Sequence, residues 1–108
     1  MNLPTEIFGN VIVVHTPEEL GEDQADGFEA FMPTLERRNV VLDLDSTERL
    51  DSAGLGALLN VYDKLREEGG DVKVTTSNLS NRKILEITRL DQQLEVFECV
   101  VDAVGSFT

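Results

Sequence analysis

Residues that could carry out enzymatic chemistry are scarce in this sequence. The 108 residues include one histidine, His15, and one cysteine, Cys99. A zinc site built on spaced histidine and cysteine ligands is therefore excluded. A nucleophilic cysteine would have to take its histidine base from this same pair. A buried structural thiol and a surface imidazole are the simpler interpretation.

Two aspartates and an acidic stretch are the other candidates. Asp43 and Asp45 share one face of a predicted strand and could hold a magnesium ion, but solvated carboxylates are the simpler explanation. The acidic stretch 18–23 (EELGED) is either a surface for a basic partner or a solvated loop. Neither a GxGxxG motif nor a P-loop occurs in the sequence, so we predict no cofactor. Because histidine and cysteine are scarce and the aspartates are best explained as solvated, we also predict no metal.

The most informative segment begins a predicted helix. It contains the motif Asp51-Ser52-Ala53-Gly54-Leu55-Gly56. Free amides and the positive end of the helix dipole favour an anion there, so a phosphate on Ser52 would be accommodated. A glycine costs up to about 1 kcal/mol relative to alanine inside a helix, and the two glycines therefore indicate close approach or a bare surface. Alternatively, Ser52 is only an N-cap and the glycines pack against the sheet.

The motif lies between two segments, 40–45 and 72–76, that alternate apolar and polar residues as half-buried strands do. Because a parallel sheet covered on both faces would be aliphatic throughout, we predict helices on one face and water on much of the other. The helix between these strands carries one apolar stripe. Its predicted N-cap is Ser52, and Gly69-Gly70 ends it.

Before the motif, the apolar stretches 7–8 and 11–14 flank Gly9-Asn10, which is a spacing typical of a tight hairpin. The apolar residues of 28–35 share one helical face, and Pro33 must break or kink that helix because it lacks an amide hydrogen.

After the motif, a helix is predicted from Asn78 to Leu90, with Ser80 as a possible cap and Ile84 and Ile87 on its apolar face. A short strand near 94–97 and a closing helix complete the order β-β-α-β-α-β-α-β-α. The predicted fold class is α/β, a single small domain over residues 1–108 with a mixed β-sheet and helices mainly on one face.

Composition restricts the partners. Hydrophobic residues make up 41% of the chain and charged residues 28%, values typical of a folded globular domain. Nine basic residues against 21 acidic ones give a formal charge of −12, which disfavours nucleic acid and membrane surfaces. The start of the sequence lacks the features of a signal peptide, and a lone cysteine forms no internal disulfide. Both observations favour the cytoplasm.

The sequence around the motif resembles a known family. The run VVLDLDSTERLDSAGLGALLNVYDKLREEGGDVKV (residues 40–74) is similar to the STAS domain of bacterial anti-sigma factor antagonists. In that family a hydrophobic strand leads to an Asp-Ser-x-Gly-Leu-Gly turn and helix, and then to Gly-Gly and another strand. The resemblance extends over residues 5–104, and DSAGLG is its most specific element. It implies a STAS-like fold for this chain.

The resemblance implies that Ser52 is a phosphorylation site. In the family, the serine after the aspartate is phosphorylated by a partner that is both anti-sigma factor and serine kinase, and a phosphatase resets it. The unphosphorylated form binds the anti-sigma factor and frees the sigma factor, and phosphorylation abolishes this. Residues 51–56 are the implied partner-binding residues. Many members carry Gly-Glu-Leu-Asp after the second strand, whereas Gly21 replaces that aspartate here, so the family's contacts at this loop do not carry over directly.

Two other functions remain open at this point. The chain could be a STAS interaction subunit of a larger stress-signalling or lipid-transport assembly, which neighbouring scaffold or transporter genes would favour. A neighbouring gene for a histidine-kinase-like ATPase would favour the antagonist instead. An enzyme is the third interpretation, and it is disfavoured because no base or metal cluster accompanies Ser52.

Overall fold

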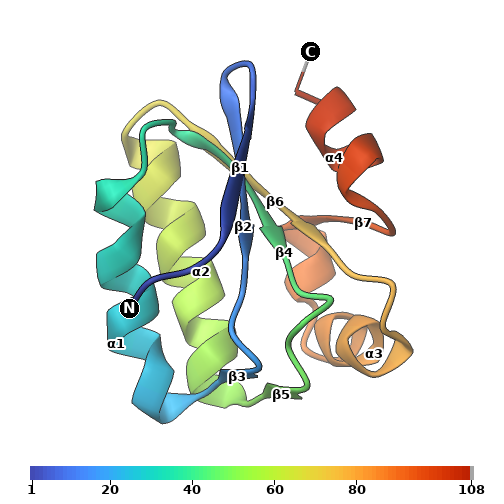
Figure 1. Cartoon of the computed structure of the whole chain (residues 1–108). Coiled ribbons are helices and arrows are strands. Elements are labelled where there is room, and N and C mark those ends of the chain that lie inside the picture. Colours follow the sequence, from blue (N-terminus) through green and yellow to red (C-terminus); the bar gives the residue numbers. More distant parts are fainter. Residues whose placement is uncertain (108) are drawn as a thin grey trace.

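The computed structural model describes residues 1–107, which are built around a five-stranded sheet in the order β1-β2-β4-β6-β7 (Figure 1). The strands are β1 (Thr5–Phe8), β2 (Val11–His15), β4 (Asn39–Asp43), β6 (Asp71–Thr75) and β7 (Glu95–Phe97). Strand β1 is antiparallel to β2, and all the other neighbours are parallel. The predicted mixed sheet is therefore confirmed.

A second, two-stranded sheet pairs β3 (Glu19–Leu20) with β5 (Arg49–Leu50) in parallel. Within residues 1–107 the helices are α1 (Glu22–Phe31), α2 (Ser52–Glu67), α3 (Leu79–Ile87) and α4 (Val100–Gly105), with 3-10 turns η1 (Met32–Thr34) and η2 (Leu90–Gln92). The small sheet leads directly into the N-terminal ends of α1 and α2 (Figure 1). None of the helices in this part of the chain has the length and apolar character needed to span a membrane.

The hairpin and the interrupted first helix follow the sequence predictions. Gly9 has a φ of 63° and turns the chain from β1 into β2, with Phe8 opposite Val11. Helix α1 ends at Phe31 and continues only as η1, because Pro33 has no amide hydrogen to donate to the helix ladder. The acidic stretch 18–23 is not a loop. It forms β3 and the first residues of α1.

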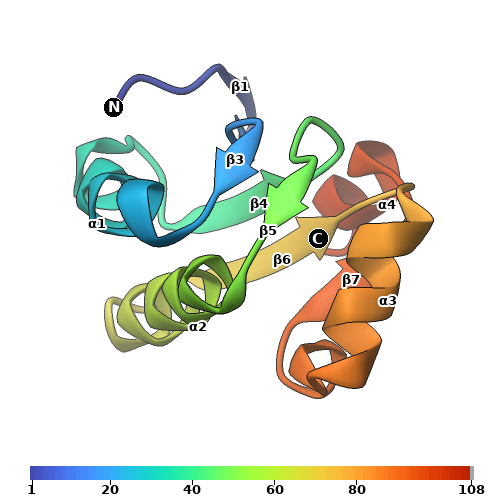
Figure 2. The same ribbon diagram turned by 90° about the horizontal axis from the view of Figure 1, so that it is seen from below.

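The sheet separates two apolar cores of unequal size. The larger one lies between the sheet and helices α1 and α2, and it also contains Leu85 from α3. The smaller one consists of Val11, Val13, Val41 and Ala103, and it lies beneath α4. Figure 2 shows α4 on the opposite side of the sheet from α1 and α2. The fold class is confirmed, but the expectation that water covers much of the second face is wrong because α4 lies there.

Polar residues on this second face are buried together with their partners. Asp43 and Lys73 are only 8% and 6% exposed. Lys73 Nζ lies 2.7 Å from Ser106 Oγ and 4.6 Å from the centroid of the Phe107 ring. The polar members of an alternating strand were interpreted as solvent-facing. The C-terminal segment supplies the hydrogen bond that buried Lys73 requires, whereas Asp43 is satisfied by His15, Thr75 and the amide of Asp45.

Helix α3 corrects the sequence prediction in two respects. Its N-cap is Asn78, whose side-chain oxygen accepts from the amides of Ser80 and Asn81, so Ser80 is not the cap. Its buried residues are Asn81 and Leu85, whereas Ile87 is 71% exposed. Asn81 can lie inside because its amide group donates to the carbonyl oxygens at residues 44 and 47, at 3.3 and 2.8 Å.

Candidate functional site

The motif of residues 51–56 lies at the start of α2, beside the small sheet. The N-cap is Asp51, whose Oδ1 accepts from the amide of Gly54 at 3.0 Å. The prediction that Ser52 caps the helix is therefore wrong. Aspartate and serine are comparably good caps, and the extended backbone at Asp51 (φ −103°, ψ −176°) ends the non-helical chain one residue earlier than the sequence analysis expected.

Ser52 is consequently the first residue of the helix, and its side chain is directed to solvent. It is exposed, and its hydroxyl makes no hydrogen bond to any of residues 1–107. The amides of Ser52 and Ala53 also donate no hydrogen bond within the described chain. An exposed hydroxyl therefore lies next to free backbone donors, which is an arrangement that accommodates an anionic group.

Asp51 also connects the beginnings of the two long helices. Its second oxygen, Oδ2, accepts from the amide of Glu22 at 3.3 Å, in the first turn of α1. The N-cap of α1 is Gly21, whose own amide donates to Gln24 Oε1 at 3.0 Å. A single carboxylate thus stabilises the N-termini of both α1 and α2.

This contact explains the glycine at position 21. A Cβ atom there would lie 2.6 Å from Asp51 Oδ2, which is closer than real Cβ contacts. Gly21 was noted in the sequence only as a departure from the family pattern. The structure shows that it makes room for Asp51, a relation between residues 30 positions apart that no local pattern in a single sequence reveals.

The two glycines of the motif play different roles. A Cβ on Gly54 would lie 1.9 Å from the carbonyl oxygen of Leu20, so Gly54 is required for the packing of α2 against β3. A Cβ on Gly56 would meet no atom within 4 Å. Gly54 thus packs against the small sheet, as the structural alternative predicted, whereas Gly56 lies at an open position of the helix. The neighbouring Ala53 and Leu55 are half-buried.

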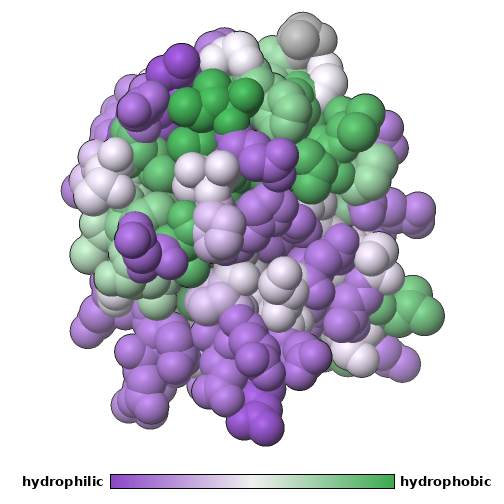
Figure 3. Space-filling view, in the orientation of Figure 1, coloured by the Kyte–Doolittle hydropathy of each residue, from purple (hydrophilic) through white to green (hydrophobic). Residues whose placement is uncertain are grey.

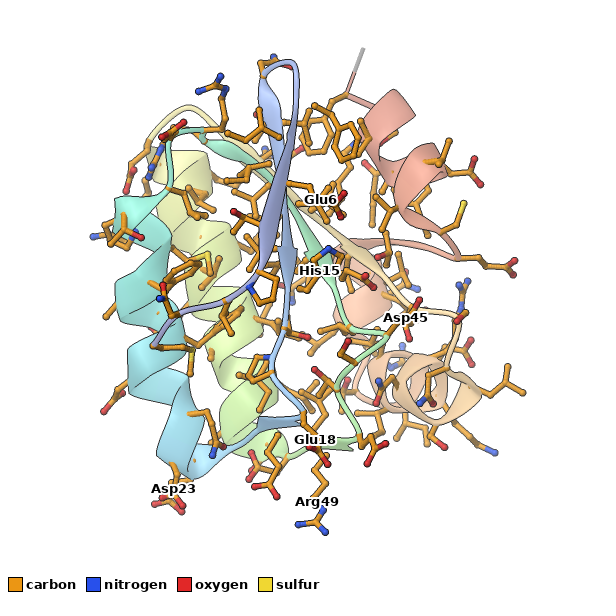
Figure 4. All side chains as sticks on the ribbon, viewed as in Figure 1. Glu6, His15, Glu18, Asp23, Asp45 and Arg49 are labelled. Atoms are coloured by element: carbon orange, nitrogen blue, oxygen red, sulfur yellow. The ribbon has the colours of Figure 1, made fainter. Side chains whose placement is uncertain are left out.

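An open acidic hollow adjoins Asp51. It has a volume of about 600 Å³, and it combines carboxylates from β3, from α1 and from the residues on either side of β5 with one basic side chain. Its lining includes Glu19, Glu22, Asp23, Glu48, Arg49 and Asp51. Arg49 is already paired with Glu19 at 2.8 Å. Figure 3 shows hydrophilic side chains gathered at this end of the molecule, and Figure 4 places Glu18, Asp23 and Arg49 there. We call this region the acidic hollow.

One apolar side chain of α3 reaches the acidic hollow, and two others on this helix are exposed. Ile84 contributes to its lining. Leu79 and Ile87, on the same helix, are 84% and 71% exposed. Exposed aliphatic side chains such as these are a frequent feature of protein interaction sites.

The other sequence candidates do not form a site. Asp43 and Asp45 diverge: the first binds His15, while the second accepts from the amide and hydroxyl of Ser77 at 2.7 and 3.1 Å. No group of three metal-ligating side chains occurs within residues 1–107. Cys99 is exposed rather than buried, and both ring nitrogens of the half-buried His15 bind carboxylates. Neither ring nitrogen is therefore available to activate the thiol.

The sequence and the fold are shared with known proteins. The family model for the STAS domain matches residues 2–103. A protein of Paenibacillus polymyxa named anti-sigma F factor antagonist is 28% identical over 109 residues, which cover 95% of this chain and 93% of that protein.

Solved structures show the same arrangement of elements. The crystal structure of an anti-sigma factor antagonist from Mycobacterium paratuberculosis matches with a TM-score of 0.85 and 26% identity, covering 97% of this chain and 92% of that one. The structure of the Bacillus cell-fate determinant SpoIIAA in its phosphorylated form matches with a TM-score of 0.71 and 15% identity, over 99% of this chain and all of that one. At 15% identity the second similarity concerns the fold alone.

Proposed function

Because this chain belongs to the STAS domain family, we propose that it is an anti-sigma factor antagonist whose binding is controlled by phosphorylation of Ser52. The relatives named as anti-sigma factor antagonists support the first part of the proposal. The observation that supports control by phosphorylation is the exposed Ser52 hydroxyl at the first position of α2. The chain then acts by binding, with no catalysis of its own.

The position of Ser52 suits a reversible phosphate. Phosphorylation adds about −1.5 to −2 charges and three acceptor oxygens. The amides of Ser52 and Ala53 have no other acceptor among residues 1–107, and the helix dipole favours a negative charge at this end. The fold should therefore tolerate the modification.

The same phosphate would oppose a partner that docks over the motif. Gly56 leaves the surface of α2 bare, so a partner can approach the helix closely beside Ser52. A dianion trapped in such an interface must lose its water, which costs several kcal/mol unless cations meet it. Since about 1.4 kcal/mol already corresponds to a tenfold change in affinity, phosphorylation acts as a switch.

The acidic hollow and α3 suggest the chemistry of the partner surface. Carboxylates outnumber the single arginine in the hollow, so complementary lysine or arginine side chains favour association. The exposed Leu79 and Ile87 supply the apolar part of such an interface. We assign this surface to an anti-sigma factor that is also the serine kinase of Ser52, and the resetting step to a phosphatase.

The experiment combines phosphosite mapping with titration calorimetry. Candidate kinases encoded in the same genome are incubated with the protein and ATP, and the modified residue is identified by mass spectrometry. The cognate anti-sigma factor is then titrated with wild type, Ser52→Ala, Ser52→Asp and Gln93→Glu. The last variant is a charge-matched control, because Gln93 is exposed and lies outside the motif.

We expect Ser52→Ala and Gln93→Glu to bind as wild type does and Ser52→Asp to bind at least about tenfold more weakly. A phosphosite elsewhere, or equal affinities for wild type and a folded Ser52→Asp, would count against the switch. Failure to bind any anti-sigma factor would instead favour a STAS subunit of a larger assembly.

A further inference from the structure

His15, outside the site described above, lies at the end of β2 between two carboxylates. Its Nε2 is 2.8 Å from Oε1 of Glu6 on β1, and its Nδ1 is 2.9 Å from Oδ2 of Asp43 on β4. Figure 4 shows the His15 and Glu6 side chains close together over the strands. Asp43 in turn accepts from Thr75 Oγ1 on β6 at 3.3 Å. One imidazole ring therefore joins a hydrogen-bonded row that crosses four strands.

The two contacts together favour one protonation state of the ring. An ionised carboxylate only accepts hydrogen bonds, and a neutral imidazole donates through one nitrogen and presents a lone pair at the other. A neutral His15 would therefore satisfy one carboxylate and direct a lone pair at the second. The imidazolium form donates to both. In agreement, the hydrogen bond to Glu6 raises the pKa of His15 above 6.5, and Asp43 adds to this against the desolvation of the ring.

The other charged groups around this face have their own partners or are exposed. Lys73 on β6 lies 3.7 Å from Glu95 on β7. Asp45, which follows β4, accepts from Ser77. On and before α4, Asp102 and Cys99 are exposed. Glu6 and Asp43 are therefore the charged groups that hold the proton on His15.

We propose that protonated His15 holds the edge strand β1 to the sheet through Glu6, and that deprotonation of the ring releases this contact. Strand β1 is exposed along its whole length and pairs only with β2, so the sheet holds it from one side alone. When the ring loses its proton, one of its two charge-assisted hydrogen bonds must be lost.

The burial of the two carboxylates decides which bond is lost. The Glu6 side chain is 56% exposed and can be hydrated, whereas that of Asp43 is 11% exposed and would be left with an unsatisfied oxygen. The neutral ring therefore keeps its hydrogen on Nδ1 for Asp43 and releases Glu6. Strand β1 loosens as the pH rises through the pKa of His15, while the central strands stay paired.

Because the chain has a single histidine, NMR titration of the ring is unambiguous. The complete protein is titrated as wild type, as Glu6→Gln, and as Glu67→Gln, a control that makes the same change at an exposed position of α2. We expect a wild-type midpoint above 6.5, a lower midpoint in Glu6→Gln and an unchanged one in Glu67→Gln. The ¹⁵N shifts of the deprotonated ring should report the tautomer with hydrogen on Nδ1.

Amide hydrogen exchange tests the consequence for the strand. After correction for intrinsic exchange rates, the protection of β1 amides should fall across the titration, while that of β6 amides should not change. A wild-type midpoint at or below 6.5, an equal midpoint in Glu6→Gln, the tautomer with hydrogen on Nε2, or constant protection in β1 would each overturn the proposal.

Discussion

Asp43 and Asp51 both connect segments that are distant in the chain, but their surroundings differ. Asp43 is buried beneath the second face of the sheet and shares its charge with His15 and Thr75. Asp51 is exposed, accepts from the amides of Gly54 and Glu22, and borders the acidic hollow. The buried carboxylate is thus paired with a histidine inside the sheet, whereas the exposed one accepts only from backbone amides and borders a hollow in which carboxylates outnumber the single arginine.

The motif itself shows the same division on a smaller scale. Gly54 packs α2 against β3 so closely that a Cβ atom would not fit, and Asp51 joins α2 to α1 by accepting from the Glu22 amide. The Ser52 hydroxyl makes no hydrogen bond within residues 1–107, and a Cβ added at Gly56 would meet no atom within 4 Å. Residues that pack against the rest of the chain and residues open to solvent thus alternate within the motif, and the substitutions at 51, 52, 54 and 56 test to which of the two groups each residue belongs.

Gly54→Ala is expected to have the largest effect on stability. The added Cβ would lie 1.9 Å from the carbonyl oxygen of Leu20, and relief requires the backbone of α2 or β3 to move. Overpacking of this severity costs about 3 kcal/mol, measured by chemical denaturation. Gly56→Ala is the matched control and should gain up to about 1 kcal/mol from helix propensity. Equal stabilities of the two variants would contradict the close packing at Gly54.

Asp51→Ala should lower the free energy of unfolding by about 1 to 2 kcal/mol, because the N-termini of α1 and α2 both lose a hydrogen-bond acceptor. Asp51→Asn keeps one side-chain oxygen and should recover part of this loss. The control is Asp63→Ala, at an exposed position of α2. If Asp51→Ala unfolds at the same denaturant concentration as that control, Asp51 does not stabilise the two helices.

The effect of His15 on stability should depend on pH. Its pKa in the folded protein is raised above 6.5 by Glu6 and Asp43, so the folded state binds the proton more tightly than the unfolded state does. The resulting stabilisation is complete below pH 6.5 and is lost as the pH rises through the folded pKa. The difference in unfolding free energy between wild type and His15→Gln should therefore be constant from pH 5.5 to 6.5 and decrease above it. A constant difference up to pH 9 would contradict this.

Local patterns in the sequence predicted the elements of the fold but not the contacts between them. The Gly9 turn, the break at Pro33 and the start of α2 near residue 52 all depend on neighbouring residues, and all were predicted correctly within a residue. The hydrated second face was predicted wrongly. Alternation shows which side chains point the same way, but it does not show that α4 returns to cover them.

The site was predicted in part for the same reason. The motif and its position at a helix N-terminus follow from the order of residues 50–59. The link from Asp51 to Glu22 and the room that Gly21 leaves for Asp51 depend on residues about 30 positions apart that meet only in the folded chain. The burial of Asn81 likewise depends on its carbonyl partners at residues 44 and 47, which the local sequence does not reveal.

Ser52→Ala should have the smallest effect on stability, within about 0.5 kcal/mol of wild type. Asp51 is the cap, and the Ser52 hydroxyl makes no hydrogen bond within residues 1–107, so its removal leaves no buried group unsatisfied. Denaturation midpoints of wild type and Ser52→Ala measure this directly, with Ser80→Ala as a control at a similar exposed position in the first turn of α3. A loss near 1 kcal/mol would mean that Ser52 acts as a cap after all. An unchanged midpoint would mean that the serine is not needed for folding, which is the condition under which a change of charge at this residue can regulate binding and leave the fold intact.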